Sequence, residues 1–250
     1  MGQRIRGILF DLGDTLLDFG KINAPRLFEE GAKLAYAYLR RLKQPLPSFW
    51  RYSRQQLWAV RWHYFCSHIT GREFSSVELI RRIGRKFGQE LTAEQLTELG
   101  WLWYRPLSRC ATVETGLAEM LAALRSSGLV LGVVSNTFIP ATALDRHLER
   151  LGLLEQLPVR VYSCEIGYRK PRREIFLEAC RQAELEPAQA VFVGDSLRAD
   201  IHGAGRMGMF TVLKDVAGRY NGHHVPADAC IRSILELPQV LRDLEARSDS

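Results

Sequence analysis

Two aspartates with a glycine between them stand where an apolar run ends, close to the start of the chain. In ILFDLGDT the run ends at Asp11, and Asp14 follows after Leu12 and Gly13. A carboxylate at the end of a strand can attack an electrophile and form a covalent intermediate. The pattern therefore indicates nucleophilic chemistry at Asp11, with Asp14 as a second acid nearby.

Three further segments carry polar residues at the end of an apolar run or a few residues after it. Ser135 and Asn136 lie in VVSNTF, and Lys170 lies in GYRKP. Asp195 ends the run in VFVGDSLRAD, and Asp200 follows five residues later. These residue types favour one kind of site, in which carboxylates, a hydroxyl and an ammonium group act together.

Several acids that converge on one point repel each other unless a cation lies among them. Hard oxygen ligands without clustered His or Cys favour Mg²⁺. The hydroxyl of Ser135, its neighbouring backbone amides and Lys170 are suited to binding the oxygens of a phosphoryl group. Because phosphoryl transfer depends mainly on positioning and charge neutralisation, the residues predict this chemistry.

The elements that must position these residues alternate along the chain. Amphipathic helical patterns, such as 141–151, 173–183 and 198–208, separate most of the apolar runs. This alternation predicts a Rossmann-like α/β core, a parallel sheet covered on both faces, with its chemistry at the carboxyl ends of the strands. The predicted strands are 6–10, 130–135, 158–163, 190–194 and 209–213.

Residues 18–112 have a different character. They contain helical patterns over 24–42, 48–65, 75–87 and 92–104, no convincing strand, and all five tryptophans. We interpret this segment as an all-helical domain inserted after the first strand, with most of its tryptophans in its core. The predicted organisation is a core of residues 1–17 and 113–250 and a helical insert of residues 18–112.

The four segments resemble the motifs of the haloacid dehalogenase-like hydrolase superfamily, over nearly the whole chain. Asp11 matches the family's nucleophile, Ser135 its second motif, Lys170 its third and GDSLRAD its fourth. The resemblance implies a type I cap for residues 18–112, and a cap of this type favours small soluble substrates. It also implies a Mg²⁺-dependent phosphatase of small phosphate monoesters that works through an aspartyl-phosphate.

The resemblance assigns roles to the individual residues. The metal would be held by Asp11, the backbone carbonyl of Gly13 and Asp195. Ser135, Asn136 and Lys170 would bind the substrate, with Lys170 also moderating the charge around Asp11. We expect Asp200 to position Lys170 or a metal-bound water.

Gly13 departs from the family pattern, because phosphatases of this family usually have a second aspartate there as general acid. Asp14 stands one place later and replaces that acid only if Gly13 lets the loop reorient it; otherwise Asp14 has a structural role near Thr15. Loss of general acid catalysis costs roughly 10²–10⁴-fold in rate. A slow phosphatase, or one whose leaving group is acidic, would tolerate this loss.

The departure leaves three alternatives to a phosphatase. Family dehalogenases lack this aspartate too, and phosphonate-cleaving relatives use a cap lysine as a Schiff base, for which Lys21, Lys33, Lys43 and Lys86 are available. The third alternative is a feeble or non-catalytic protein that binds phosphate compounds or a partner. Turnover of aryl phosphates distinguishes that protein from an enzyme, because a good leaving group needs little protonation.

Bulk properties restrict the partners. The net charge of +6 lies largely in helix-like stretches such as 81–88, which we interpret as a solvated basic face rather than a nucleic-acid surface. The sequence contains no run of 18 apolar residues, so it predicts no membrane span and we expect no membrane partner. Five cysteines without a CxxC pair suit reduced thiols in a cytoplasm.

Overall fold

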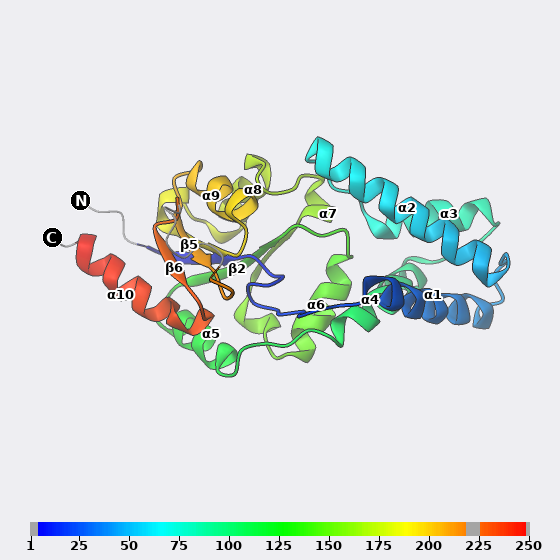
Figure 1. Ribbon diagram of the computed structural model, residues 1–250, viewed down its shortest axis with the longest axis horizontal. Helices are drawn as coiled ribbons and strands as arrows, with labels where there is room; N and C mark the ends of the chain where they lie inside the picture. Colours follow the sequence, from blue (N-terminus) through cyan, green and yellow to red (C-terminus); the bar gives the residue numbers. More distant parts are fainter. Residues whose placement is uncertain (1–4, 219–225, 249–250) are drawn as a thin grey trace.

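The fold is built on one parallel sheet. The computed structural model describes residues 5–218 and 226–248, and within these ranges six strands pair in the order β3-β2-β1-β4-β5-β6 (Figure 1). Asp11 therefore follows a central strand, with β2 on one side and β4 on the other. The strands are β1 (Gly7–Phe10), β2 (Val130–Ser135), β3 (Val159–Tyr162), β4 (Ala190–Gly194), β5 (Phe210–Lys214) and β6 (Ala229–Ile231).

Helices bury both faces of this sheet. Along β1, Ile8 and Phe10 belong to one apolar cluster, whereas Leu9 belongs to another. The alternation follows from the strand period of two, and it explains why the strands have almost no polar residues. The first cluster includes α5 (Leu117–Ser126), α6 (Ala141–Arg150) and α10 (Leu237–Ser248); the second includes α8 (Arg173–Ala183) and α9 (His202–Gly205).

Short helical turns occupy the connections between these elements. They are α7 (Ser163–Ile166), η1 (Leu154–Gln156), η2 (Pro187–Gln189), the π-helical turn η3 (Leu197–Ile201) and η4 (Ile234–Glu236). Two of them, α7 and η3, follow strand ends at the edge of the sheet where Asp11 lies.

Four helices form a cap that is inserted after β1, and Figure 1 shows them extending away from the sheet. They are α1 (Ala24–Arg41), α2 (Phe49–Thr70), α3 (Ser76–Lys86) and α4 (Ala93–Ser108). The chain leaves and re-enters the core side by side, because Asp18 and Thr112 exchange backbone hydrogen bonds of 2.9 and 2.8 Å. Trp101 and Tyr104 of α4 also join the apolar cluster of the sheet.

Two sequence predictions about the core were wrong in detail. Strand β6 was not predicted, because its three residues, Ala229–Ile231, are too short for an alternation pattern. The segment 198–208 was predicted as one helix, but a π-helical turn over Leu197–Ile201 precedes the short helix α9. That turn matters for the site, because it contains Asp200.

The prediction that most of the tryptophans lie in the core of the helical insert was also wrong. Trp101 is buried, but Trp50, Trp58 and Trp62 of α2 are each more than 60% exposed. Periodicity identifies the helix, whereas neighbouring helices decide which of its faces is covered. Although α2 is long and rich in aromatics, arginines interrupt it, and no helix in residues 5–218 and 226–248 is long and apolar enough to cross a membrane.

Candidate active site

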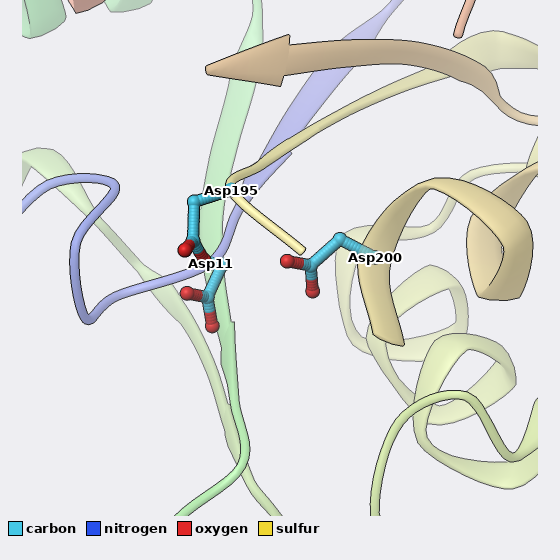
Figure 2. Close-up of side chains that lie close together, drawn as sticks. All are labelled: Asp11, Asp195 and Asp200. Atoms are coloured by element: carbon cyan, nitrogen blue, oxygen red, sulfur yellow. The ribbon is translucent and has the colours of Figure 1, made fainter. Parts of the chain in front are cut away.

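Three carboxylates meet at the carboxyl edge of the sheet. Asp11 follows β1, Asp195 follows β4, and Asp200 lies in η3. Figure 2 shows their side chains directed toward a common space, and one oxygen of each lies within 4.8 Å of the others. Asp11 and Asp200 are buried and Asp195 is half-buried. The structure therefore brings together three of the four acids singled out from the sequence at this edge, and Asp14 is the fourth.

Lys170 connects two of these acids from the opposite side. Its ammonium nitrogen Nζ lies 2.6 Å from Asp11 Oδ1 and 2.7 Å from Asp200 Oδ1. A third bond of 2.7 Å goes to the backbone carbonyl of Val134, and the lysine is buried. The ammonium group thus donates hydrogen bonds to Asp11 and Val134 and forms an ion pair with Asp200, which fixes its position beside Asp11.

Asn136 holds the backbone of Lys170. Its side-chain oxygen accepts a hydrogen bond of 2.7 Å from the Lys170 N–H, and its side-chain nitrogen donates one of 3.0 Å to the Lys170 carbonyl. The side chain predicted to bind substrate is thus engaged with Lys170. Asn136 acts on the site through Lys170.

Local geometry explains the glycine before Asp195. A Cβ atom added to Gly194 would lie 2.4 Å from Cγ of Asp200, so no side chain fits there. Asp200 is held in this position because its Oδ2 accepts a hydrogen bond of 3.0 Å from the Ser196 N–H. The tight turn between Gly194 and Asp200 brings two carboxylates of one short segment to the same point.

We expect Gly194→Ala to disturb the site through Asp200. The added methyl group must displace Asp200, which bonds to Lys170, so we expect a loss of about 1–3 kcal/mol in unfolding free energy. Urea denaturation measures this change. Gly205→Ala is the matched control, because its nearest neighbour would lie at 3.8 Å; equal losses in the two variants would contradict the expectation.

The charges of the cluster suit a divalent cation. Burial raises the pKa of Asp11 to about 7; Lys170 opposes this effect, whereas Asp200 and Asp195 add to it. Burial lowers the pKa of Lys170, but Asp11 and Asp200 outweigh it and hold that pKa above its usual value. One ammonium group cannot neutralise three carboxylates, so the acids fit a hard cation with oxygen ligands.

A cavity of about 300 Å³ opens beside the carboxylates. We call it the strand-edge cavity, and its lining includes Asp11, Gly13, Ser135, Lys170 and Asp195. Ser135 is buried, and its hydroxyl makes no hydrogen bond within the described part of the chain. A donor of this kind at the edge of a cavity is available to an oxygen of a bound ligand.

Asp14 has an unusual place in the loop that follows Asp11. Its φ is 58°, a left-handed conformation, and its N–H donates a hydrogen bond of 2.7 Å to the carbonyl of Leu17. The residue is exposed and lines the strand-edge cavity, but among the described residues its carboxylate stands outside the cluster of three acids. Asp14 as the substitute acid therefore stays a prediction.

The sequence analysis missed the support beneath this loop. The Lys214 Nζ donates a hydrogen bond of 2.7 Å to the carbonyl of Thr15 and lies 2.8 Å from Glu114. The hydroxyl of Thr15 in turn contacts Asp11 Oδ2 at 3.4 Å. Lys214 ends β5, so its place at the end of a predicted strand was the one signal that could have identified it.

The protein is of the parallel α/β class, with four helices inserted after β1 and a cluster of acids at the carboxyl edge of its sheet. The family model for haloacid dehalogenase-like hydrolases matches residues 5–208. The chain belongs to this family, and the family resemblance found in its four motifs is confirmed.

Individual relatives align with nearly the whole chain. A glyceraldehyde 3-phosphate phosphatase of Methanopyrus kandleri is 33% identical, covering 96% of this chain and 98% of its own. An N-acetylmuramic acid 6-phosphate phosphatase of Pseudomonas aeruginosa is 35% identical, covering 96% of each.

Solved structures show the same arrangement. A phosphatase of this family from Thermococcus onnurineus superposes with a TM-score of 0.58 at 26% identity, over 95% of this chain and 98% of that one. A 2-haloacid dehalogenase from Pseudomonas syringae has a TM-score of 0.64 at 23% identity, over 96% and 99%, and shows the shared fold alone. The fold of nearly the whole chain is thus found in solved structures of known proteins.

Proposed function

We propose that the protein is a Mg²⁺-dependent phosphatase of small phosphate monoesters with Asp11 as its nucleophile. The observation that carries this proposal is the meeting of Asp11, Asp195, Asp200 and Lys170 beside the strand-edge cavity. The two relatives that align over nearly their whole length are both named as phosphatases of small phosphorylated compounds, which supports the same reaction here.

The carboxylates of Asp11 and Asp195, together with the carbonyl of Gly13, would hold the metal ion. When bound, Mg²⁺ supplies positive charge that offsets the repulsion between nucleophile and phosphoryl oxygens. Asp200 accepts from the Ser196 N–H and pairs with Lys170, so it is a positioning residue for that lysine.

The reaction has two steps on this chain's own residues. An oxygen of Asp11 attacks phosphorus, the bond between phosphorus and the ester oxygen breaks, and its electron pair leaves with that oxygen. Water then attacks the aspartyl-phosphate, releasing inorganic phosphate and the free carboxylate. Lys170 favours the ionised form of Asp11, and Ser135 offers its hydroxyl to a phosphoryl oxygen.

The cap lysines give no support to a phosphonate-cleaving enzyme. Lys21, Lys33, Lys43 and Lys86 are all exposed, and none of them lines the strand-edge cavity. A Schiff-base lysine needs a pocket that lowers its pKa. The pair of acids in GDSLRAD lies in the cluster, as the magnesium-dependent chemistry requires.

Turnover of p-nitrophenyl phosphate and a small panel of phosphate monoesters tests the proposal. We expect hydrolysis with Mg²⁺ and its loss in EDTA, with recovery when Mg²⁺ is added back in excess. Release of inorganic phosphate measures both. Equal turnover with and without chelator would contradict the metal requirement, and no turnover on any ester would favour the non-catalytic binding protein.

Binding of Mg²⁺ can be measured without catalysis. A ligand that binds only the folded protein stabilises it by about 2.7 kcal/mol at 100 times its Kd. We therefore expect Mg²⁺ to raise the Tm of the wild type, and Asp195→Asn to reduce this shift strongly because one ligand is lost. Asp243→Asn on the exposed face of α10 is the control and should keep the full shift; the same shift in all three proteins would contradict the assigned ligands.

A further inference from the structure

A second cavity, of about 220 Å³, lies inside the cap and reaches the core loop after β2. We call it the cap cavity. Each cap helix contributes an apolar side chain to it, and the aromatic rings in its wall are Phe28, Trp103, Tyr104 and Phe138. Gln56 and Ser76 are the main polar side chains in this wall. The cap cavity is therefore built to hold an apolar group with few hydrogen bonds.

The two cavities lie next to each other. Tyr104, Leu107 and Ile139 line both the cap cavity and the strand-edge cavity. A phosphate monoester whose phosphorus stands at Asp11 must direct its leaving group away from the carboxylates. The neighbouring space on that side is the cap cavity, so its wall contacts the leaving group.

The strand-edge cavity contains no dedicated donor of a proton to the departing alcohol. Asp11, Asp195 and Asp200 form the cluster, and Lys170 is bonded to two of them. The hydroxyl of Tyr104 is hydrogen-bonded to His147 Nδ1 at 2.9 Å, and burial raises the pKa of Tyr104 above its usual value. Only the exposed Asp14 remains among the acids that line the strand-edge cavity.

The acidity of the leaving group decides how strongly the missing proton donor slows the reaction. A phenol has a pKa of about 10, whereas an aliphatic alcohol is about as weak an acid as water, whose pKa is about 15.7. A phenolate leaves without taking up a proton in the transition state. An alkoxide needs a proton donor there, and the loss of general acid catalysis costs roughly 10²–10⁴-fold.

We propose that the substrate class is an aryl phosphate monoester, with its ring in the cap cavity and its phosphate at Asp11. The inference rests on the phosphatase function proposed above. A cavity of about 150 Å³ lined by apolar side chains is sufficient for benzene, so the cap cavity holds a single substituted ring. Offset and edge-to-face packing against Phe28, Trp103 and Phe138 favours an aromatic ring over an aliphatic one.

Gln56 provides a polar side chain in the wall of the cap cavity. The residue is only 3% exposed and lines the cap cavity, and its side-chain amide makes no hydrogen bond within residues 5–218 and 226–248. An amide in the wall of a cavity is available to a polar group of a bound ligand. The ring that the cap cavity accepts therefore carries a substituent that exchanges a hydrogen bond with Gln56, whereas a polyhydroxylated group would leave most of its hydroxyls without partners.

A matched pair of esters tests the preference in the wild-type enzyme. Phenyl phosphate and cyclohexyl phosphate have rings of similar size but leaving groups of very different acidity. We expect kcat/KM with Mg²⁺ to be at least about 10²-fold higher for phenyl phosphate. Equal or faster hydrolysis of cyclohexyl phosphate, or a preference for glycerol or sugar phosphates, would overturn the inference.

A pair of variants on α2 tests the location of the ring. Val60 lines the cap cavity, and Arg61 is its exposed neighbour. We expect Val60→Trp to fill the cavity and to lower kcat/KM for phenyl phosphate at least about tenfold through KM, while inhibition by inorganic phosphate stays unchanged. Arg61→Trp should leave all of these quantities unchanged; no difference between the two variants would overturn the location.

The outcomes separate this inference from the phosphatase function beneath it. Mg²⁺-dependent turnover that is fastest on a polyol phosphate retains the phosphatase and rejects the aryl substrate. Absence of turnover on every ester rejects both. If Val60→Trp does not fold, as judged by circular dichroism, the comparison of the two wild-type substrates still decides the substrate class.

Discussion

Asp11→Asn is expected to lower Mg²⁺-dependent hydrolysis of phosphate monoesters by a factor of at least about 10⁴. The amide oxygen of asparagine is a poor nucleophile, so the covalent step with phosphorus is lost. The substitution also removes one charge from the cluster, which reduces the attraction for Mg²⁺. Initial rates on p-nitrophenyl phosphate, compared with the wild type at equal protein concentration, measure the loss.

A second aspartate from the same loop provides the control for this variant. Asp18 is exposed and its side chain accepts a hydrogen bond from the Gly20 N–H. We expect Asp18→Asn to keep nearly full activity, since its carboxylate does not belong to the cluster of three acids. Comparable activity in Asp11→Asn and wild type would exclude Asp11 as the nucleophile and with it the proposed mechanism.

Lys170→Met is expected to destabilise the fold and to abolish activity together. The ammonium group lies within 2.7 Å of both Asp11 and Asp200, and all three residues are buried. Removing one partner of a buried ion pair leaves an uncompensated charge, which costs about 3–5 kcal/mol. Urea denaturation in EDTA measures this loss, and Mg²⁺ should recover part of it because the cation offsets the carboxylates.

Lys33→Met removes a lysine whose ion pair is exposed. Its Nζ lies 2.6 Å from Glu29, but the two side chains are 61% and 56% exposed. Solvent screens such a pair, so we expect a change of less than about 1 kcal/mol and unchanged activity. If the two methionine variants had equal stability, Lys170 would not hold the buried carboxylates in the way that the distances indicate.

The arrangement explains why a buried cluster of charges is stable at all. Lys170 is held from both sides, by Asn136 at its backbone and by two carboxylates at its ammonium group. Gly194 leaves the space that Asp200 occupies. The contacts of Lys170 join segments that are far apart in the sequence, so the site forms only when the sheet is complete.

Much of the fold follows directly from local patterns in the sequence. The five predicted strands all occur, because short apolar runs between amphipathic helices must be buried on both faces. The four cap helices also occur close to their predicted ranges, and α2 ends where Gly71 adopts a φ of 67°. The three-residue strand β6 and the π-helical turn at Asp200 have no comparable local pattern.

The chemistry of the site was likewise visible in residue types at strand ends. In a parallel sheet the carboxyl ends of the strands share one edge, so residues at those ends approach each other whatever the loops between them. This is why Asp11, Ser135, Lys170 and Asp195 were identified from their order along the chain. Gly13 was recognised as a departure because phosphatases of the family that the motifs resemble usually have an aspartate there.

Sequence alone thus determined the elements, their order and the residues at the reactive edge, because these depend on local periodicity and on where each strand ends. Tertiary structure alone decided that Asn136 holds Lys170, that Lys214 supports the loop after Asp11, and that three tryptophans of α2 face solvent. It also decided that an apolar cavity lies beside the carboxylates. These features depend on which remote segments pack against each other, and no local pattern contains that information.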